Sequence, residues 1–226
     1  MEEYKSAEKK RTARQVFMGA LFLLVVVAGW RYPLLGYFIP MCMLLGIGIG
    51  VFKGRKWCDW LCPRGGFFDA WLKPLSPKKE IPKFLKGLPL RLGIIIFLFL
   101  VMAIQIIVRW PNPYKIGMFF VVMLTVTTLL GIILGLFFHQ RSWCCFCPIG
   151  TIANLVGGNR HPLKIDSQSC TECKLCQGVC PIQIAPYRFK ETGVQIVKDG
   201  DCLKCKLCVL ACPKGALNFS DKQPFL

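Results

Sequence analysis

Four long apolar stretches separate the charged parts of this chain, and they restrict its fold more than any other feature. The second and fourth stretches have the ~20 residues that a helix needs to cross a bilayer, and the first and third must borrow flanking residues or tilt differently. The hydrophobic content of 54% and mean hydropathy of +0.48 exclude a soluble globule and a disordered chain. The sequence therefore predicts a membrane region of four helices, over Val16–Trp30, Tyr32–Phe52, Leu92–Val108 and Gly117–Phe138.

The net charge of +17 flanks these stretches instead of forming a separate basic domain. Residues 1–141 hold 19 basic and 6 acidic side chains, and no zinc-finger or RNA-binding motif accompanies them, so we expect no nucleic-acid partner. The Lys53–Arg91 connection alone carries ten basic residues. The positive-inside rule then predicts a cytoplasmic (inner) membrane protein whose amino end, middle loop and carboxyl tail all face the cytoplasm.

The tail contains one cysteine pattern twice, C-x2-C-x2-C-x3-C-P, at positions 170–181 and 202–213. Such a loop supplies three thiolates to one [4Fe-4S] cluster, and its fourth cysteine, followed by proline, ligates the other cluster. Zinc knuckles and cytoplasmic disulfides fit this doubled spacing poorly. The predicted ligands are Cys170, Cys173, Cys176 and Cys212 for cluster one, and Cys202, Cys205, Cys208 and Cys180 for cluster two.

Over about Ser169–Phe219 the tail resembles the bacterial two-cluster ferredoxins. We therefore expect a small α+β ferredoxin domain of the 2[4Fe-4S] type, whose chemistry is a relay of single electrons. The predicted division of the chain is a basic amino terminus at 1–15, a four-helix transmembrane domain at 16–160 and the ferredoxin domain at 161–226.

A second repeated motif follows the second and the fourth apolar stretches. Residues 55–65 read RKWCDWLCPRG and residues 141–150 read RSWCCFCPIG. Each half of the membrane domain is thus a helical hairpin followed by a basic Trp-Cys and Cys-Pro-x-Gly segment. Two helices per half return the chain to the same side, which predicts parallel repeats related by an axis along the membrane normal. Both cysteine segments should then meet at the membrane surface.

Four cysteines from these segments, two from each half, predict a third iron–sulfur cluster between the hairpins. The site would lie at helix carboxyl ends, where nearby basic side chains offset the dipole and favour thiolates. Acylated or merely buried thiols are the alternative. The predicted ligands are Cys58, Cys62, Cys144 and Cys147, with Cys145 as the alternative to Cys144; the basic residues are Lys53, Arg55, Lys56, Arg64 and Arg141.

The whole arrangement resembles the NapH-type membrane iron–sulfur proteins, relatives of quinol dehydrogenase subunits. The second motif departs from the family's C-x3-C-P spacing, because Cys144 gives C-x2-C-P and Cys145 gives C-x-C-P. The resemblance implies an electron-transfer subunit of an oxidoreductase complex, which exchanges electrons between the quinone pool and a soluble or membrane redox partner, together with other subunits.

Two further residues are candidates to contact a quinone. His139 follows the fourth span and Gln105 lies within the third. A cap at a helix end and a contact with a neighbouring helix are the alternatives for them. The alternative functions for the chain are a membrane anchor or assembly factor, and a maturation factor, for an adjoining redox enzyme.

Overall fold

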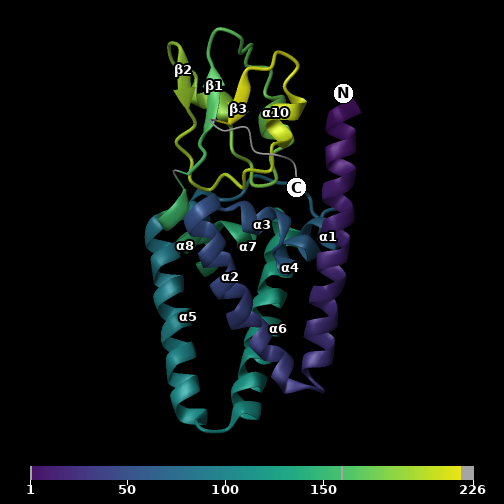
Figure 1. Ribbon diagram of the computed structural model, residues 1–226, viewed down its shortest axis with the longest axis vertical. Coiled ribbons are helices and arrows are strands. Elements are labelled where there is room, and N and C mark those ends of the chain that lie inside the picture. Colours follow the sequence, from purple (N-terminus) through teal and green to yellow (C-terminus); the bar gives the residue numbers. More distant parts are fainter. Residues whose placement is uncertain (1, 159, 220–226) are drawn as a thin grey trace.

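The computed structural model describes residues 2–158 and 160–219. Figure 1 shows a layer of long helices with a small strand-containing domain stacked on one end, beside the amino terminus. Four helical segments are long and apolar enough to cross a membrane, which supports a membrane protein. They are α1 (Glu2–Gly29), η1 with α2 (Pro33–Tyr37 and Phe38–Lys53), α5 (Leu88–Arg109) and α6 (Pro113–Phe137).

The first helix is longer than the apolar pattern predicted. It begins at Glu2 instead of Val16, so the basic amino terminus continues the helix beyond the apolar layer. Two polar residues on this extension, Arg11 and Gln15, are buried. Pro40 causes no break inside the second span, because α2 begins at Phe38 and the proline falls in its first turn, where no hydrogen bond is lost.

Short helical pieces follow each hairpin at the end of the bundle that carries the small domain. In each half a five-residue helix precedes the Cys-Pro pair, with Leu61 between them in the first half, and a second helix begins at the proline. Proline suits this first helical position because its missing N–H has no partner to lose there. The pieces are α3 (Lys56–Trp60), α4 (Pro63–Phe67), η2 (Phe68–Leu72) and η3 (Lys83–Lys86), then α7 (Ser142–Phe146) and α8 (Pro148–Gly157).

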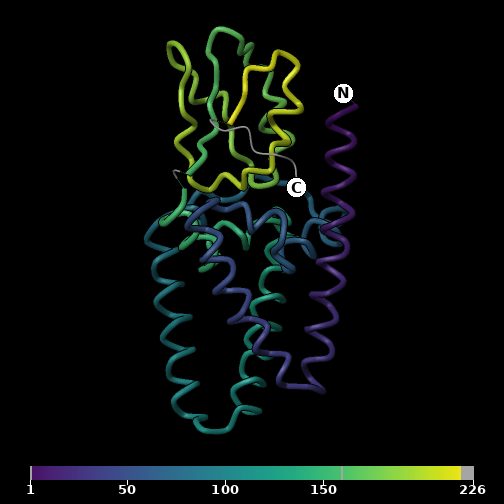
Figure 2. The backbone as a smooth tube through the Cα atoms, viewed as in Figure 1, coloured from purple at the N-terminus to yellow at the C-terminus, as the bar shows by residue number. Residues whose placement is uncertain are grey.

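The small domain contains a three-stranded antiparallel sheet of order β2-β1-β3. Its first strand lies in the middle, and Ile165 pairs with Gln195 on one side and with Leu217 on the other. Figure 2 shows the chain between these strands winding into compact loops. The elements are β1 (Leu163–Asp166), α9 (Leu175–Gly178), η4 (Pro186–Phe189), β2 (Val194–Ile196), α10 (Leu207–Ala211) and β3 (Leu217–Phe219).

The core of the small domain continues into the membrane region. The inward side chains of β1, Leu163 and Ile165, belong to one buried cluster that also includes Trp57 and Cys58 of α3. The ferredoxin-like domain is therefore packed directly on the first Trp-Cys segment, and the two parts of the chain share apolar burial. The predicted domain at 161–226 includes residues 220–226, which lie outside the described residues.

A buried network of charges holds α1 against both halves. The guanidinium of Arg11 contacts Asp59 and Asp69, with N–O distances of 2.6 Å to each. Asp69 also accepts hydrogen bonds from Gln15 at 2.9 Å and from two nitrogens of Arg141 at 2.9 and 2.8 Å. Burial would raise the pKa of Asp69, but Arg141 and then Arg11 hold it well below its usual value, so it stays ionised.

Replacement of Arg11 by Met should destabilise the protein by about 3 kcal/mol, because it leaves buried Asp59 and Asp69 to share a single arginine. The measurement is the midpoint of thermal unfolding in detergent. Lys10→Met, one residue away on an exposed position, is the matched control and should leave the midpoint nearly unchanged. Equal midpoints for the two variants would show that the network contributes little.

Candidate iron–sulfur centres

A small cavity in the ferredoxin-like domain is lined by all four cysteines that the sequence assigns to cluster one. It has a volume of about 20 Å³ and lies between the first cysteine loop and the Cys212-Pro213 turn. The loop cysteines Cys170, Cys173 and Cys176 come from residues that are adjacent in sequence, whereas Cys212 comes from the second motif. The fold thus brings together three thiols of one motif and the fourth thiol of the other.

The second cavity repeats this arrangement with the motifs exchanged. It also measures about 20 Å³, and its wall contains Cys202, Cys205 and Cys208 with Cys180 of the first motif. Burial raises the pKa of Cys202 to about 11 and that of Cys180 above its usual value. Buried thiols with raised pKa become thiolates only when a positive partner such as iron replaces the proton.

Both cysteine loops share an unusual backbone. Glu172 and Lys174 in the first loop, and Lys204 and Lys206 in the second, have positive φ angles between 54 and 64°. This left-handed conformation is costly for residues other than glycine, so its repetition at equivalent positions indicates a loop that must wrap tightly around a central point. Within residues 2–158 and 160–219, no three Cys, His, Asp or Glu side chains are close enough to share a single ion. A cubane, in contrast, keeps its four sulfur ligands apart.

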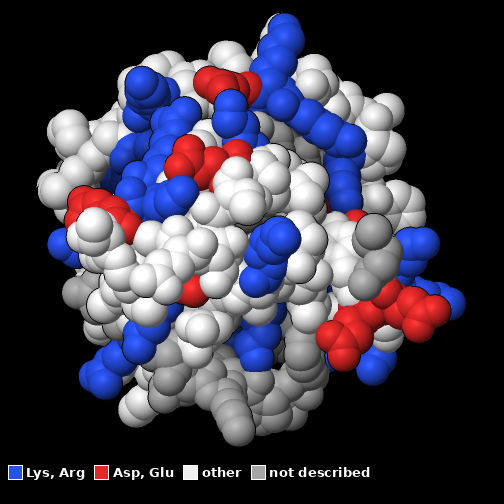
Figure 3. Space-filling view, turned by 90° about the horizontal axis from the view of Figure 1, so that it is seen from above, with Lys and Arg blue, Asp and Glu red and all other residues white. Residues whose placement is uncertain are grey.

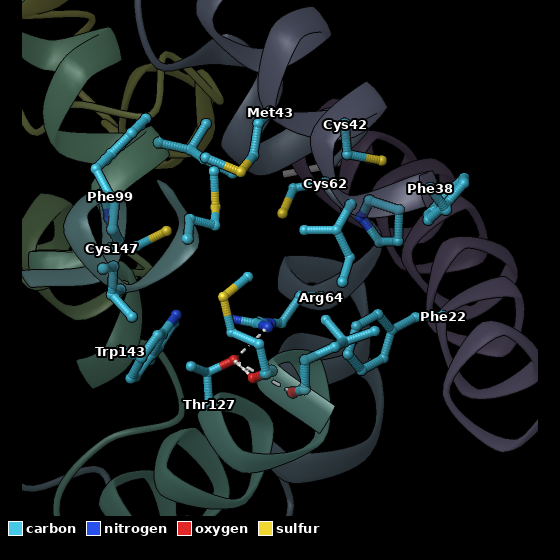
Figure 4. Close-up of a pocket in the computed structure, with 18 residues that line it drawn as sticks. Phe22, Phe38, Cys42, Met43, Cys62, Arg64, Phe99, Thr127, Trp143 and Cys147 are labelled. Atoms are coloured by element: carbon cyan, nitrogen blue, oxygen red, sulfur yellow. Dashed lines mark hydrogen bonds between the residues drawn. The ribbon is translucent and has the colours of Figure 1, made fainter. Parts of the chain in front are cut away.

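The four membrane-surface cysteines of the Cys-Pro segments also converge. Burial is the main cause that raises the pKa of Cys62 to about 12, and the neighbouring thiols of Cys58, Cys144 and Cys147 raise it further. Figure 4 shows the sulfurs of Cys62 and Cys147 pointing into the same cavity from opposite sides. The thiols of the two halves therefore lie near one another, and their role as ligands of one cluster stays a prediction.

Each half contributes an arginine that crosses to the other half. Arg55 of the first half donates to the carbonyl oxygen of Cys144 at 2.5 Å, and Arg141 of the second half donates to that of Cys58 at 2.9 Å. Arg141 also approaches the Cys144 sulfur at 3.7 Å. Both arginines are almost fully buried, at 1% and 0% exposure. Burial would lower the pKa of both guanidinium groups, but the thiols and carboxylates around them raise it.

The glycine of each Cys-Pro-x-Gly segment makes room for this crossing. A Cβ at Gly65 would lie 2.9 Å from Arg141 Nη1, and a Cβ at Gly150 would lie 2.7 Å from Arg55 Nη2. The arginine tips cannot move aside freely because they are buried and hydrogen-bonded on several sides. The repeated motif therefore encodes two parts of one contact, an arginine from one half and a glycine from the other.

The carboxylates that balance the two arginines come from different places. Asp69 lies just after the first Cys-Pro-x-Gly segment, and the equivalent position in the second half is Asn154. Asn154 instead donates to Asp201 of the ferredoxin-like domain at 2.8 Å, and Asp201 accepts from Arg55 at 2.7 Å. Arg91 adds two further bonds to Asp201. Burial would raise the pKa of Asp201, but the hydrogen bonds from Arg91 and the charge of Arg55 lower it.

The structure separates Cys144 from Cys145. Cys144 is a neighbour of Cys58, Cys62 and Cys147. Burial is the main cause that raises the pKa of Cys145 to about 12, and the charge of Lys86 opposes this rise. The Cys145 thiol donates to the carbonyl oxygen of Arg141, one helical turn earlier, at 3.7 Å. This arrangement favours Cys144 over Cys145 as the partner of the other three thiols.

His139 and Gln105 lie away from these cavities. His139 closes the turn before α7: its backbone N–H donates to the Ser142 hydroxyl at 3.2 Å, and its Nδ1 accepts from the Arg141 backbone at 3.2 Å. Burial lowers its pKa to about 4. Gln105 is half-buried on α5, within two turns of the end at Arg109 that is remote from the cysteines. Neither residue lines the cavity that Figure 4 shows.

Two family models match the regions that form these sites. The model described as a 4Fe-4S binding domain matches twice, at residues 35–82 and 117–164, which are the two Cys-Pro halves. The model described as a 4Fe-4S dicluster domain matches residues 169–217. Together with the four apolar helices, these matches support a membrane-associated iron–sulfur protein of the ferredoxin type.

Several curated proteins are homologous to the chain. The "Putative electron transport protein YccM" of Escherichia coli K12 is 29% identical over 160 residues, 61% of this chain and 44% of that protein. The "Methylamine utilization ferredoxin-type protein MauN" of Paracoccus denitrificans is 28% identical over 189 residues, 77% of this chain and 64% of that protein. An uncharacterised protein of Methanocaldococcus jannaschii is 28% identical over 146 residues, 62% of this chain and 57% of that protein. The alignments thus span less than two thirds of each relative, and no solved structure matches significantly.

Substitution of Gly150 by Ala should displace Arg55 from the Cys144 carbonyl and cost about 1–3 kcal/mol of stability, as overpacking does in a tight core. The readouts are the thermal midpoint and the iron content per chain. Gly48→Ala is the control, since no described atom lies within 4 Å of a Cβ at that position. A Gly150→Ala protein with full stability and full iron content would show that the arginine can be displaced without harm.

Substitution of Asp201 by Asn should weaken the attachment of the ferredoxin-like domain, because buried Arg55 and Arg91 lose their shared carboxylate. Loss of one partner of a buried ion pair costs about 3 kcal/mol. Hydrogen exchange should become faster at β1 and at α3, which share a core. Glu191→Gln, an exposed change on the same domain, should leave these exchange rates as they are; equal rates in the two variants would contradict the role of Asp201.

Proposed function

We propose that this chain is an integral membrane electron-transfer protein that relays single electrons through three [4Fe-4S] clusters between the quinone pool and a redox partner. The observation that carries the proposal is the convergence of twelve cysteines in three sets of four, two sets around small cavities in the ferredoxin-like domain and one between the helical hairpins. When bound, a [4Fe-4S] cluster gains or loses one electron at a time.

The cysteines have defined roles in this proposal. In the ferredoxin-like domain, Cys170, Cys173, Cys176 and Cys212 hold cluster one, and Cys202, Cys205, Cys208 and Cys180 hold cluster two. At the membrane surface, Cys58, Cys62, Cys144 and Cys147 hold the third cluster. The fit of this third set is supported by charge: four thiolates with iron and sulfide carry net negative charge, and the buried guanidinium groups of Arg55 and Arg141 lie beside them.

The packing of the domains orders the sites along the relay. Asp201, the residue before Cys202 of the cluster-two set, accepts a hydrogen bond from Arg55 at 2.7 Å, and the Cys205 thiol is close enough to Asp59 and Arg11 to interact with them electrostatically. The cluster-two set is therefore the one that faces the membrane-surface site. The cluster-one set links to it within the domain, where the Cys176 and Cys208 thiols are close enough to interact electrostatically. Electrons would pass between the membrane and the outer tip of the domain through the three sites in sequence.

The outer face of the ferredoxin-like domain suits an acidic redox partner. Figure 3 shows the end of the molecule that carries this domain, with a mostly white centre, blue Lys and Arg side chains mainly toward the rim, and fewer red acidic ones. The described part of the domain, residues 160–219, holds nine basic and five acidic side chains. A partner attracted by this charge would bind faster at low salt, since surface charges act mainly on the association rate. The basic connections support a cytoplasmic position for this face, by the positive-inside rule.

The membrane-side partner in this proposal is a quinone. The resemblance to NapH-type proteins favours this partner, and the homologues named for electron transport and for methylamine utilization favour a role within a larger redox system. Other subunits would supply the substrate chemistry, as the chain's own sites are suited to electron relay. Membrane anchoring of a neighbouring enzyme and maturation of its metal centres are the competing functions.

Anaerobically purified protein should contain about twelve iron and twelve acid-labile sulfide per chain, the content of three cubanes. Cys58→Ser and Cys144→Ser should each lower both values to about eight, because a cubane that loses one thiolate is not retained. Cys42→Ser and Cys145→Ser are matched controls, as these are the two cysteines outside the three sets, and both should retain about twelve. About eight iron in the unaltered protein would remove the membrane-surface cluster from the proposal.

The same variants separate the relay from its competitors. A relay predicts that Cys58→Ser abolishes electron transfer between a quinol and a soluble acceptor while the protein still assembles with its partners. An anchor predicts loss of assembly alone. A maturation factor predicts metal-deficient partner enzyme with little change in electron transfer by the purified protein.

A further inference from the structure

A mostly apolar cavity of about 120 Å³ lies among the helices directly below the membrane-surface cysteines. Its walls come from α1, α2, α5 and α6 and from both Cys-Pro segments (Figure 4). The cavity is not enclosed, and Phe99 in its wall is 37% exposed, which gives the cavity an opening at the surface of the helical layer. The apolar part of the wall includes Phe38, Met43, Phe99, Met102, Met123 and Leu124.

Two polar groups converge at the cysteine end of this cavity. The indole N–H of Trp143 is buried and has no hydrogen-bond partner within the described residues, and Trp143 itself is only 5% exposed. Arg64 enters the same space, donates to the Thr127 hydroxyl at 2.8 Å and lies 5.4 Å from the centre of the Trp143 ring. Figure 4 shows the indole nitrogen and the guanidinium both directed toward the centre of the cavity.

An unpaired buried N–H donor is costly unless a ligand satisfies it, and a guanidinium in an apolar cavity has further donors to offer. A ligand that fits must be apolar over most of its surface and must present acceptor oxygens at one end. It must also enter from the lipid. A quinone meets these conditions, since its ring and tail are apolar and its carbonyl oxygens accept hydrogen bonds.

We propose that this cavity is the quinone site of the protein, with a headgroup carbonyl accepting hydrogen bonds from Trp143 Nε1 and Arg64 and the tail leaving between the helices toward the lipid. This inference rests on the proposed electron relay and adds to it the location of the membrane-side partner. Cys62 and Cys147 line the cavity and Cys58 and Cys144 do not, so part of the third cluster site forms one wall of the quinone site. His139 and Gln105 play no part in this binding.

The two halves of the repeat differ at the positions of these two hydrogen-bond donors. Trp57 occupies in the first half the position that Trp143 occupies in the second, yet Trp57 packs against the ferredoxin-like domain and does not line this cavity. Likewise the position of Arg64 is taken by Ile149 in the second half, which forms apolar wall. The repeat is thus symmetric in its cysteines and asymmetric in its hydrogen-bond donors, which yields one headgroup site.

The test is direct binding of decylubiquinone to the purified full-length protein in detergent, measured by titration calorimetry. Trp143→Phe should weaken binding about five-fold, the effect of one hydrogen bond, and Arg64→Met about ten-fold or more, the effect of a charged donor. Trp57→Phe is the matched control and should leave the affinity unchanged. Iron content is measured on every variant, so that loss of a cluster is distinguished from loss of a donor.

A second measurement locates the ligand without reliance on affinity. A photoreactive azidoquinone should label peptides of α5 and α6 that contain Met102 and Met123. Leu98→Trp, which fills the cavity, should abolish this labelling, and Ile96→Trp, on a residue that is 66% exposed, should not. Labelling elsewhere, or labelling that survives Leu98→Trp, would overturn the site. If the iron content stays at about twelve in that case, the relay stands and only the quinone site is wrong.

Discussion

The crossing of Arg55 and Arg141 between the two halves is the interaction on which the rest of the structure depends. Each arginine is buried at the boundary of the helical layer, and each donates a hydrogen bond to a cysteine carbonyl of the opposite half. Taking two guanidinium groups out of water is unfavourable by several kcal/mol each, so their burial is stable only if opposite charges surround both groups. Carboxylates supply part of that charge, and the thiolates of an iron–sulfur site would supply more.

The source of the carboxylates ties the ferredoxin-like domain to the membrane region. The first half has its own, Asp69, which also fixes the long helix α1 through Arg11. The second half has the neutral Asn154 at that position. The carboxylate there comes instead from Asp201, the residue before Cys202 of the cluster-two loop. The docked small domain therefore supplies the second carboxylate of the membrane-surface site. Because Asp201 directly precedes Cys202, its ion pair also positions the cluster-two loop.

The sequence predicted the parts of this protein whose signals are local. Long apolar runs predicted four helices long and apolar enough to cross a membrane, and cysteine spacing predicted iron–sulfur domains of the 4Fe-4S class, which the family models support. In contrast, the pairing of Arg11 with Asp59 and Asp69 joins residues 48 and 58 positions apart, and that of Arg55 with Asp201 joins residues 146 apart. No periodicity in the sequence indicates which residues form such long-range ion pairs. The helical extension to Glu2 was missed for the same reason, because its buried polar residues look like ordinary exposed ones until their partners are placed.

The helix dipoles around the membrane-surface site also differ from those that the sequence predicted. From the sequence, the membrane-surface site lay only at helix carboxyl ends, where the local field opposes an anion. In the structure Cys62 and Cys147 are the residues that precede α4 and α8, so the amino-terminal ends of two helices face the site as well, and the Cys62 sulfur accepts a hydrogen bond from the Gly65 backbone at 3.4 Å. The proline of each Cys-Pro pair starts these helices and the glycine two residues later admits the opposite arginine. The short motif thus sets the thiol, the helix start and the space for the counter-charge together, which explains why both halves repeat it as a unit.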